Sequence, residues 1–249
     1  MDSLCRICCI PAELLAKVPG LGPIIRMCCT SVGQKVLMAL TGLALCGFLV
    51  AHLSGNLLLF AGEEQFNAYA EKLHSMGALL KMAEVGLLAT FLAHLGLAIS
   101  TTAMSRRARH KQYAEKESKQ GAFAIPNGGA SNWMLLTGLG IGAFVVLHLV
   151  DLKFKMRPGL DYSPAIQDGV ANEFAAVTLV LANPVSAIVY GFALILLGIH
   201  LSHGVRSALQ SLGVSHPKWD KLIEICSMAF AWAIALGFIC VLGWVALNS

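Results

Sequence analysis

Five long apolar stretches alternate with short segments that hold most of the charged residues. A helix of about 20 apolar residues crosses roughly 30 Å of membrane hydrocarbon, and each stretch is long enough to do so. The stretches cover residues 36–60, 82–104, 133–152, 184–205 and 222–247. The pattern therefore predicts five transmembrane helices.

Composition agrees with this prediction. Of the 249 residues, 57% are hydrophobic and only 13% are charged, and the mean hydropathy is +0.70. A soluble fold with this composition would lack the polar residues needed to cover its surface. The net charge of +4 is small and gives no indication of nucleic-acid binding. We expect an all-α integral membrane protein.

The basic residues indicate how the helices are oriented. With the N-terminus inside, thirteen Lys and Arg residues fall in cytoplasmic segments and five fall outside. Cytoplasmic loops carry an excess of Lys and Arg, so the N-terminus is expected in the cytoplasm and the C-terminus outside. The outer five are Lys72, Lys81, Lys153, Lys155 and Arg157.

Residues 1–30 differ from the membrane domain, which we place at 31–249. Their short apolar pieces are broken by Pro11, Pro19 and Pro23, which is typical of neither a signal peptide nor a span. We expect a cytoplasmic or interfacial segment. Its five cysteines should be reduced thiols, and their spacing is poor for a tetrahedral metal site. They are Cys5, Cys8, Cys9, Cys28 and Cys29.

Three further boundaries follow from local sequence. Asn183-Pro184 predicts the start of the fourth span, because Asn caps a helix and Pro suits its first turn. Gly213 is expected to end it. The segment 168–182 is too short and mixed for a span, and we expect a helix lying in the outer interface. We find no internal repeat.

Four spans each contain a histidine: His52, His94, His148 and His200. An ionisable residue at membrane depth is costly and is by default a functional candidate. At a rise of about 1.5 Å per residue, His52 and His148 lie ~25 and ~24 Å from the cytoplasmic side. His94 and His200 lie ~18 and ~9 Å from it. We expect one outer pair, His52 with His148, and one inner pair, His94 with His200.

Two imidazoles can ligate one haem iron from opposite sides. Two pairs on four helices therefore suit two stacked bis-histidine haems inside a bundle. Membrane histidines also form hydrogen bonds between helices or carry protons, so a haem-free transporter with a histidine relay stays an alternative. His203 is a second candidate on the fourth span.

Several motifs resemble those of one family. The chain resembles the cytochrome b subunit of succinate:quinone oxidoreductases and fumarate reductases, in its five-helix, two-haem form, from about Ser31 onward. The segments that carry the resemblance are Ser31-Val-Gly-Gln-Lys-Val-Leu-Met-Ala-Leu-Thr-Gly42, His52-Leu-Ser-Gly-Asn56-Leu-Leu-Leu-Phe60, Ala93-His94, Phe144-Val-Val-Leu-His148-Leu, Asn183-Pro184 and His200-x-x-x-Gly204-x-Arg206.

The resemblance implies the ligands of two non-covalent b haems. His52 and His148 match the pair of the distal haem, and His94 with His200 match that of the proximal haem. His200 has the family's spacing to Gly204, which favours it over His203. Arg206, and with it Lys35 or Arg106, are candidates to pair with haem propionates.

The resemblance also implies a function. This subunit would anchor a flavoprotein and an iron–sulfur protein of succinate dehydrogenase on the cytoplasmic face of a bacterial inner membrane. It would pass electrons from the iron–sulfur protein through both haems to menaquinone. The direction of turnover, succinate oxidation or fumarate reduction, the oligomeric state and coupling to proton movement are not encoded in the sequence.

Two other assignments stay open at this point. One is a cytochrome b anchor of another dehydrogenase, such as a hydrogenase or formate dehydrogenase, and the other is a purely structural anchor. No catalytic residue is assigned. The polar residues that could serve a quinone near the first and second spans are Glu63, Glu64, Asn67, Glu71, His74 and Glu84.

Overall fold

The computed structural model describes residues 30–107, 130–167 and 170–248, and it is almost entirely helical in these ranges. Five of its helices are long and apolar enough to cross a membrane, as the hydrophobic pattern predicts. They are α3 (Ser31–Asn56), α5 (Ala78–Arg107), α6 (Ala130–His148), α8 (Pro184–Ser211) and α9 (Asp220–Asn248). A 3-10 turn, η1 (Leu57–Ala61), extends α3, and a π-helical turn, η2 (Leu149–Lys153), extends α6.

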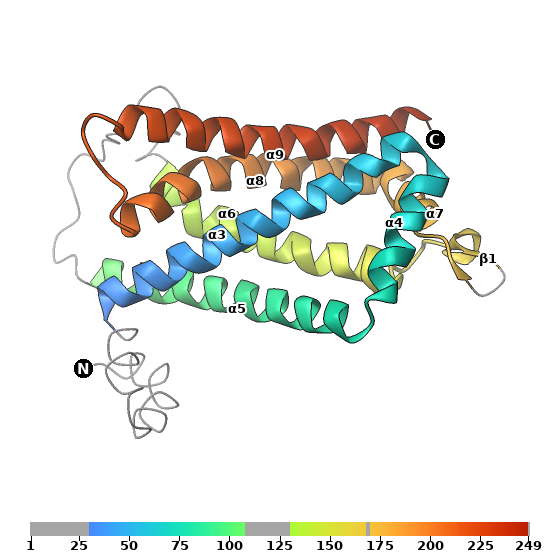
Figure 1. Ribbon diagram of the computed structural model, residues 1–249, viewed down its shortest axis with the longest axis horizontal. Coiled ribbons are helices and arrows are strands. Elements are labelled where there is room, and N and C mark those ends of the chain that lie inside the picture. Colours follow the sequence, from blue (N-terminus) through green and yellow to red (C-terminus); the bar gives the residue numbers. More distant parts are fainter. Residues whose placement is uncertain (1–29, 108–129, 168–169, 249) are drawn as a thin grey trace, which may run out of the picture.

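The five long helices run along a common axis (Figure 1). Helix α3 packs against α5 and α8, and α6 packs against α8, so these four form a bundle. Helix α9 packs along α8 and also contacts α3. The short helices α4 (Glu63–Ser75) and α7 (Glu173–Ala182) lie at one end, together with the C-terminus (Figure 1). We call this end of the bundle the α7 end.

The predicted limits of the fourth span are confirmed in α8. The Asn183 side chain accepts hydrogen bonds from the backbone N–H groups of Val185 and Ser186, both at 3.1 Å, and Pro184 is the first helical residue. The helix ends at Ser211, and Gly213 follows with φ +85°, a left-handed conformation that glycine adopts without steric cost. The cap and the proline therefore fix where this helix enters the bundle.

The segment 168–182 differs from expectation. Helix α7 begins only at Glu173, and it is preceded by two two-residue strands, β1 (Ile166–Gln167) and β2 (Val170–Ala171), which pair antiparallel. Four of its ten residues, Ala176, Val177, Val180 and Leu181, are buried. The helix therefore contributes to the protein core at this end of the bundle, because its apolar residues have α8 and α9 to pack against.

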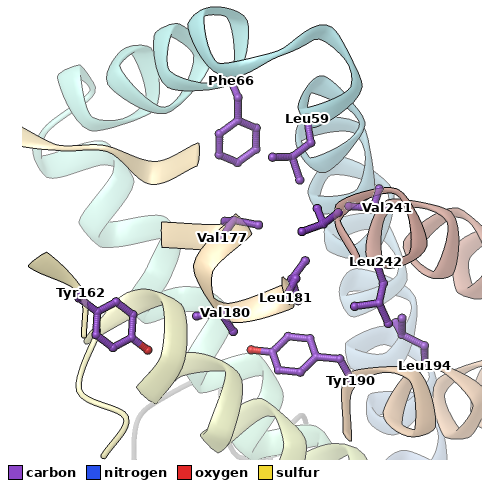
Figure 2. Close-up of a cluster of buried hydrophobic side chains, with 11 residues drawn as sticks. Leu59, Phe66, Tyr162, Val177, Val180, Leu181, Tyr190, Leu194, Val241 and Leu242 are labelled. Carbon is purple, nitrogen blue, oxygen red and sulfur yellow. The ribbon is translucent and has the colours of Figure 1, made fainter. Parts of the chain in front are cut away.

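The buried apolar side chains concentrate at the α7 end and between α8 and α9. Figure 2 shows the larger cluster, in which Leu59, Val180 and Tyr190 meet side chains of α4 and α9. A second cluster joins Leu201 of α8 to Ala231 and Ile234 of α9. By contrast, Thr101 is the one buried side chain on α5. Thr137 is the one buried side chain among those described on α6. The interior faced by α3, α5 and α6 is therefore not closed by a large apolar core.

The contact between α8 and α9 gives a first prediction. A Cβ at Gly198 would lie 3.0 Å from a ring atom of Trp232 and 3.2 Å from the Cβ of the fully buried Ala235. Gly198→Ala should therefore force the helices apart and cost about 1–3 kcal/mol, more than the gain of roughly 1 kcal/mol in helix propensity. The apparent unfolding temperature in detergent measures the difference.

The matched control is Gly191→Ala on the same helix. A Cβ at this position would make an ordinary contact, 3.7 Å from Leu242 Cδ2. This variant should be as stable as the parent protein or more stable. Equal unfolding temperatures for the two variants would contradict tight packing at Gly198.

Candidate functional site: two histidine pairs and a buried ion pair

The structure places His52 of α3 next to His148, the last residue of α6. Their ring centroids lie 5.8 Å apart with perpendicular planes. Phe48 stacks on His52 at 5.3 Å, and Phe144 lies 5.7 Å from His148. The Nδ1 atom of His148 is buried and has no hydrogen-bond partner among the described residues. This pair lies toward the α7 end, as the depth argument predicts.

His94 lies against α3, nearer the opposite end. Its Nδ1 is 3.1 Å from Thr41 Oγ1. Gly42 follows Thr41 in the chain. A Cβ on Gly42 would lie only 3.1 Å from His94 Cε1. The absence of a side chain at position 42 therefore lets the ring approach the backbone of α3.

His200 of α8 makes the same contacts with α6. Its Nδ1 is 3.1 Å from Thr137 Oγ1, and a Cβ on Gly138 would lie 3.3 Å from its Cε1. His200 also interacts electrostatically with His94 and with His203. The residues predicted as the inner pair therefore occupy one region of the bundle, each held by a Thr-Gly step of a neighbouring helix.

These contacts correct our statement that the sequence has no internal repeat. Thr41-Gly42-Leu43 is followed by Phe48, Val50, His52 and Leu53, and Thr137-Gly138-Leu139 is followed at the same spacing by Phe144, Val146, His148 and Leu149. The two copies make equivalent contacts. Thr41-Gly42 contacts His94 and Thr137-Gly138 contacts His200. The later histidines of the two copies, His52 and His148, contact each other. Hydropathy does not reveal the repeat, because every span is apolar. A direct comparison of the first and third spans does reveal it.

A second polar group lies beside the His52–His148 pair, and the sequence analysis missed it. Asp151 of η2 is fully buried, accepts a hydrogen bond from Tyr190 Oη at 2.9 Å, and forms an ion pair with Arg157 Nε at 3.0 Å. Arg157 also donates to Ser186 Oγ. Tyr190 links this group to the histidines, since its ring lies 6.0 Å from that of His148.

Tyr162 completes this polar cluster at the α7 end, which consists of Asp151, Arg157, Ser186, Tyr190 and Tyr162. The hydroxyls of Tyr162 and Tyr190 point toward one another across the cluster (Figure 2). The Tyr162 hydroxyl is buried and has no hydrogen-bond partner among the described residues. Burial raises the pKa of this hydroxyl, as does the charge of Asp151, whereas Arg157 lowers it. The signal in the sequence was an acidic residue three positions after His148 in an apolar run.

The six residues considered for a quinone have other contacts or are exposed. Glu84 pairs with Lys153 at the surface. Glu63 accepts from Asn172 Nδ2 at 2.6 Å, and Asn67 bonds both Asn172 Oδ1 and the Phe174 N–H at 2.9 Å. These bonds join α4 to the start of α7. Glu64, Glu71 and His74 are exposed.

The basic residues considered for haem propionates lie near the end of the bundle opposite the α7 end. Arg206 Nη1 forms an ion pair with Glu224 Oε2 of α9 at 2.9 Å. Its pairing with a haem propionate stays a prediction. Lys35 and Arg106 are exposed. His203 is half-buried and interacts with Arg206. The five N-terminal cysteines lie outside the described residues.

Comparison with known proteins adds no assignment. No protein-family model matches the chain, and no curated protein or solved structure matches it. The functional argument therefore depends on the residues of this chain and on their geometry.

Proposed function

We propose that the protein is a membrane-anchored di-haem cytochrome b that carries electrons across the bundle to a quinone. In this proposal His52 and His148 hold one haem near the α7 end, and His94 and His200 hold the other. The observation that supports it most directly is the arrangement of four imidazoles as two pairs, each contributed by two helices of one bundle.

The first pair consists of residues that would hold a haem iron. Two histidines from neighbouring helices could ligate one iron, which would supply one-electron chemistry. The centroids of His52 and His148 are 5.8 Å apart. The buried Nδ1 of His148 has no hydrogen-bond partner among the described residues, so a bound group could supply one.

The surroundings of the second pair also fit a flat cofactor. Gly42 and Gly138 let His94 and His200 lie close to the neighbouring helices, and no large buried apolar side chain of α5 or α6 fills the interior beside them. Interiors are normally packed to high density, so a bundle interior lined by imidazoles, hydroxyls and glycines favours a bound group. A haem at each pair would supply one-electron chemistry.

The residues of the chain then have definable tasks. The imidazoles fix the position of each iron and influence its reduction potential through their basicity and burial. The charges of Asp151 and Arg157 lie beside the pair at the α7 end and set the local field there. By the resemblance stated above, the peripheral partners are the flavoprotein and iron–sulfur subunits of succinate dehydrogenase, and the acceptor is menaquinone at the outer face.

A pyridine haemochrome assay with a redox titration of the purified complex tests this function. We expect two b haems per chain with separate midpoint potentials, and co-purification of a flavoprotein and an iron–sulfur protein. A haem-free preparation without a Soret band would overturn the proposal and favour a histidine-relay transporter. Co-purification of a hydrogenase or formate dehydrogenase would keep the cytochrome and replace the partner.

A further inference from the structure

The two Thr-Gly steps make the same set of contacts, and the direction of their hydrogen bonds can be worked out. Thr41 Oγ1 donates to the backbone oxygens of Leu37 and Met38, at 2.9 and 3.1 Å. A hydroxyl has one hydrogen, and threonine in a helix commonly gives it to the carbonyl one turn earlier. Toward His94, at 3.1 Å, the Thr41 oxygen is therefore the acceptor.

Thr137 repeats this arrangement on α6. Its Oγ1 donates to the carbonyls of Trp133 and Met134, at 3.0 and 3.1 Å, and lies 3.1 Å from His200 Nδ1. Nδ1 is consequently the protonated nitrogen of both rings. A neutral imidazole protonated at Nδ1 keeps its lone pair on Nε2, which is the atom that can bind a metal.

The glycines limit the position of the same rings. A Cβ at Gly42 or Gly138 would come within 3.1 and 3.3 Å of the Cε1 atoms of His94 and His200. Each ring is therefore held by two neighbouring residues, one through a hydrogen bond and one through close approach to the helix. His148 of the other pair has no such partner on its buried Nδ1 among the described residues.

We propose that Thr41-Gly42 and Thr137-Gly138 are two copies of one positioning device for the inner haem ligands. The glycine seats the imidazole against the neighbouring helix, and the threonine accepts from Nδ1 so that Nε2 of His94 and of His200 is presented to the iron. The inference rests on the proposed di-haem function and assigns the threonines as positioning residues that influence one haem and not the other.

The chemical consequence is a difference between the two haems. Metal-bound histidines usually donate their second ring N–H to a fixed acceptor, which sets the tautomer and raises the basicity of the ligand. A more basic imidazole stabilises ferric iron relative to ferrous iron. Loss of one threonine hydroxyl should therefore raise the midpoint potential of the inner haem and leave that of the outer haem unchanged.

The test replaces Thr41 by valine, which keeps the shape and removes the acceptor. In the purified complex we expect a higher midpoint potential and an altered low-spin ferric EPR signal for the inner haem alone. Its retention against a haem-binding acceptor protein should weaken about tenfold. Thr41→Ser keeps the hydroxyl and should restore all three properties. Thr137→Val acts on the other ring and gives the same test if Thr41→Val does not assemble.

The matched control is Thr178→Val. Thr178 of α7 donates to the carbonyls of Phe174 and Ala175 at 2.9 and 3.1 Å, as Thr41 does to its own carbonyls, but no histidine of the described ranges forms a hydrogen bond with it. This variant should leave both haems unchanged. The proposal would be overturned if the inner-haem properties were unchanged in both Thr41→Val and Thr137→Val. It would also be overturned if the midpoint potentials of both haems shifted equally.

A measurement that does not need haem separates this inference from the proposed function. Imidazole ¹⁵N chemical shifts in the purified full-length chain report which ring nitrogen carries the proton. We expect Nδ1–H for His94 and His200, with loss of this preference for His94 in Thr41→Val. A chain that lacks haem but shows this tautomer would refute the cytochrome and keep the device, whereas Nε2–H in the parent protein would refute the device.

Discussion

In the proposed di-haem cytochrome, His148→Ala is expected to reduce the haem content from two per chain to one. His148 and His52 are neighbours at 5.8 Å, so alanine at this position would leave the proposed haem at the α7 end with one protein ligand, while His94 and His200 would keep theirs. Quinone reduction should then be lost, because electrons no longer reach the outer side. Succinate oxidation with an artificial acceptor should persist, since the proposed peripheral subunits would remain intact. Haemochrome content and the two assays measure these effects.

His203→Ala is the control for the choice of ligand. His203 lies three residues after His200 on the same helix and interacts electrostatically with Arg206 and with His200. This variant should retain both haems. Two haems in His148→Ala would refute the assignment of this ligand, and one haem in His203→Ala would move the inner ligand from His200 to His203.

Arg157→Met is expected to cause a large loss of stability. It removes the partner of Asp151, whose carboxylate is fully buried and 3.0 Å from the guanidinium. Breaking a buried ion pair by removing one partner leaves an uncompensated charge and costs about 3–5 kcal/mol. The measurement is resistance to denaturation in detergent, followed by helical circular dichroism.

Two controls isolate this effect. Lys153→Met breaks the pair with Glu84, in which both side chains are more than 40% exposed, and should change stability by less than about 1 kcal/mol. The double variant Arg157→Met with Asp151→Asn removes both charges and keeps a partner for Tyr190, so it should recover most of the loss. A small effect of Arg157→Met alone would contradict a stabilising buried ion pair between Arg157 and Asp151.

The polar cluster at the α7 end coincides with a local change in the backbone. The α-helical part of α6 ends at His148 and continues as the π-helical turn Leu149–Lys153. Asp151 lies in this turn with its side chain directed to Tyr190 and Arg157. Single π-helical turns occur frequently at functional sites, and this one connects a candidate ligand to the only fully buried carboxylate among the described residues.

Hydropathy alone was enough to predict the five spans, because a membrane helix has to be apolar along its whole length. The bounds of α8 could also be predicted, since Asn183, Pro184 and Gly213 act through local backbone chemistry. The depth of His52 and His148 followed from the constant rise of a helix, and the structure brings these two residues together.

What the sequence determined by itself was therefore the number of long apolar helices and the limits of α8, because these depend on local hydropathy, length and backbone chemistry. The tertiary structure decided which partners the side chains have. It joined Thr41 to His94, Thr137 to His200 and Asp151 to Arg157 and Tyr190. It also moved α7 into the core. In uniformly apolar helices the rotation about the helix axis is set by packing against neighbouring helices, and hydropathy carries no information about it.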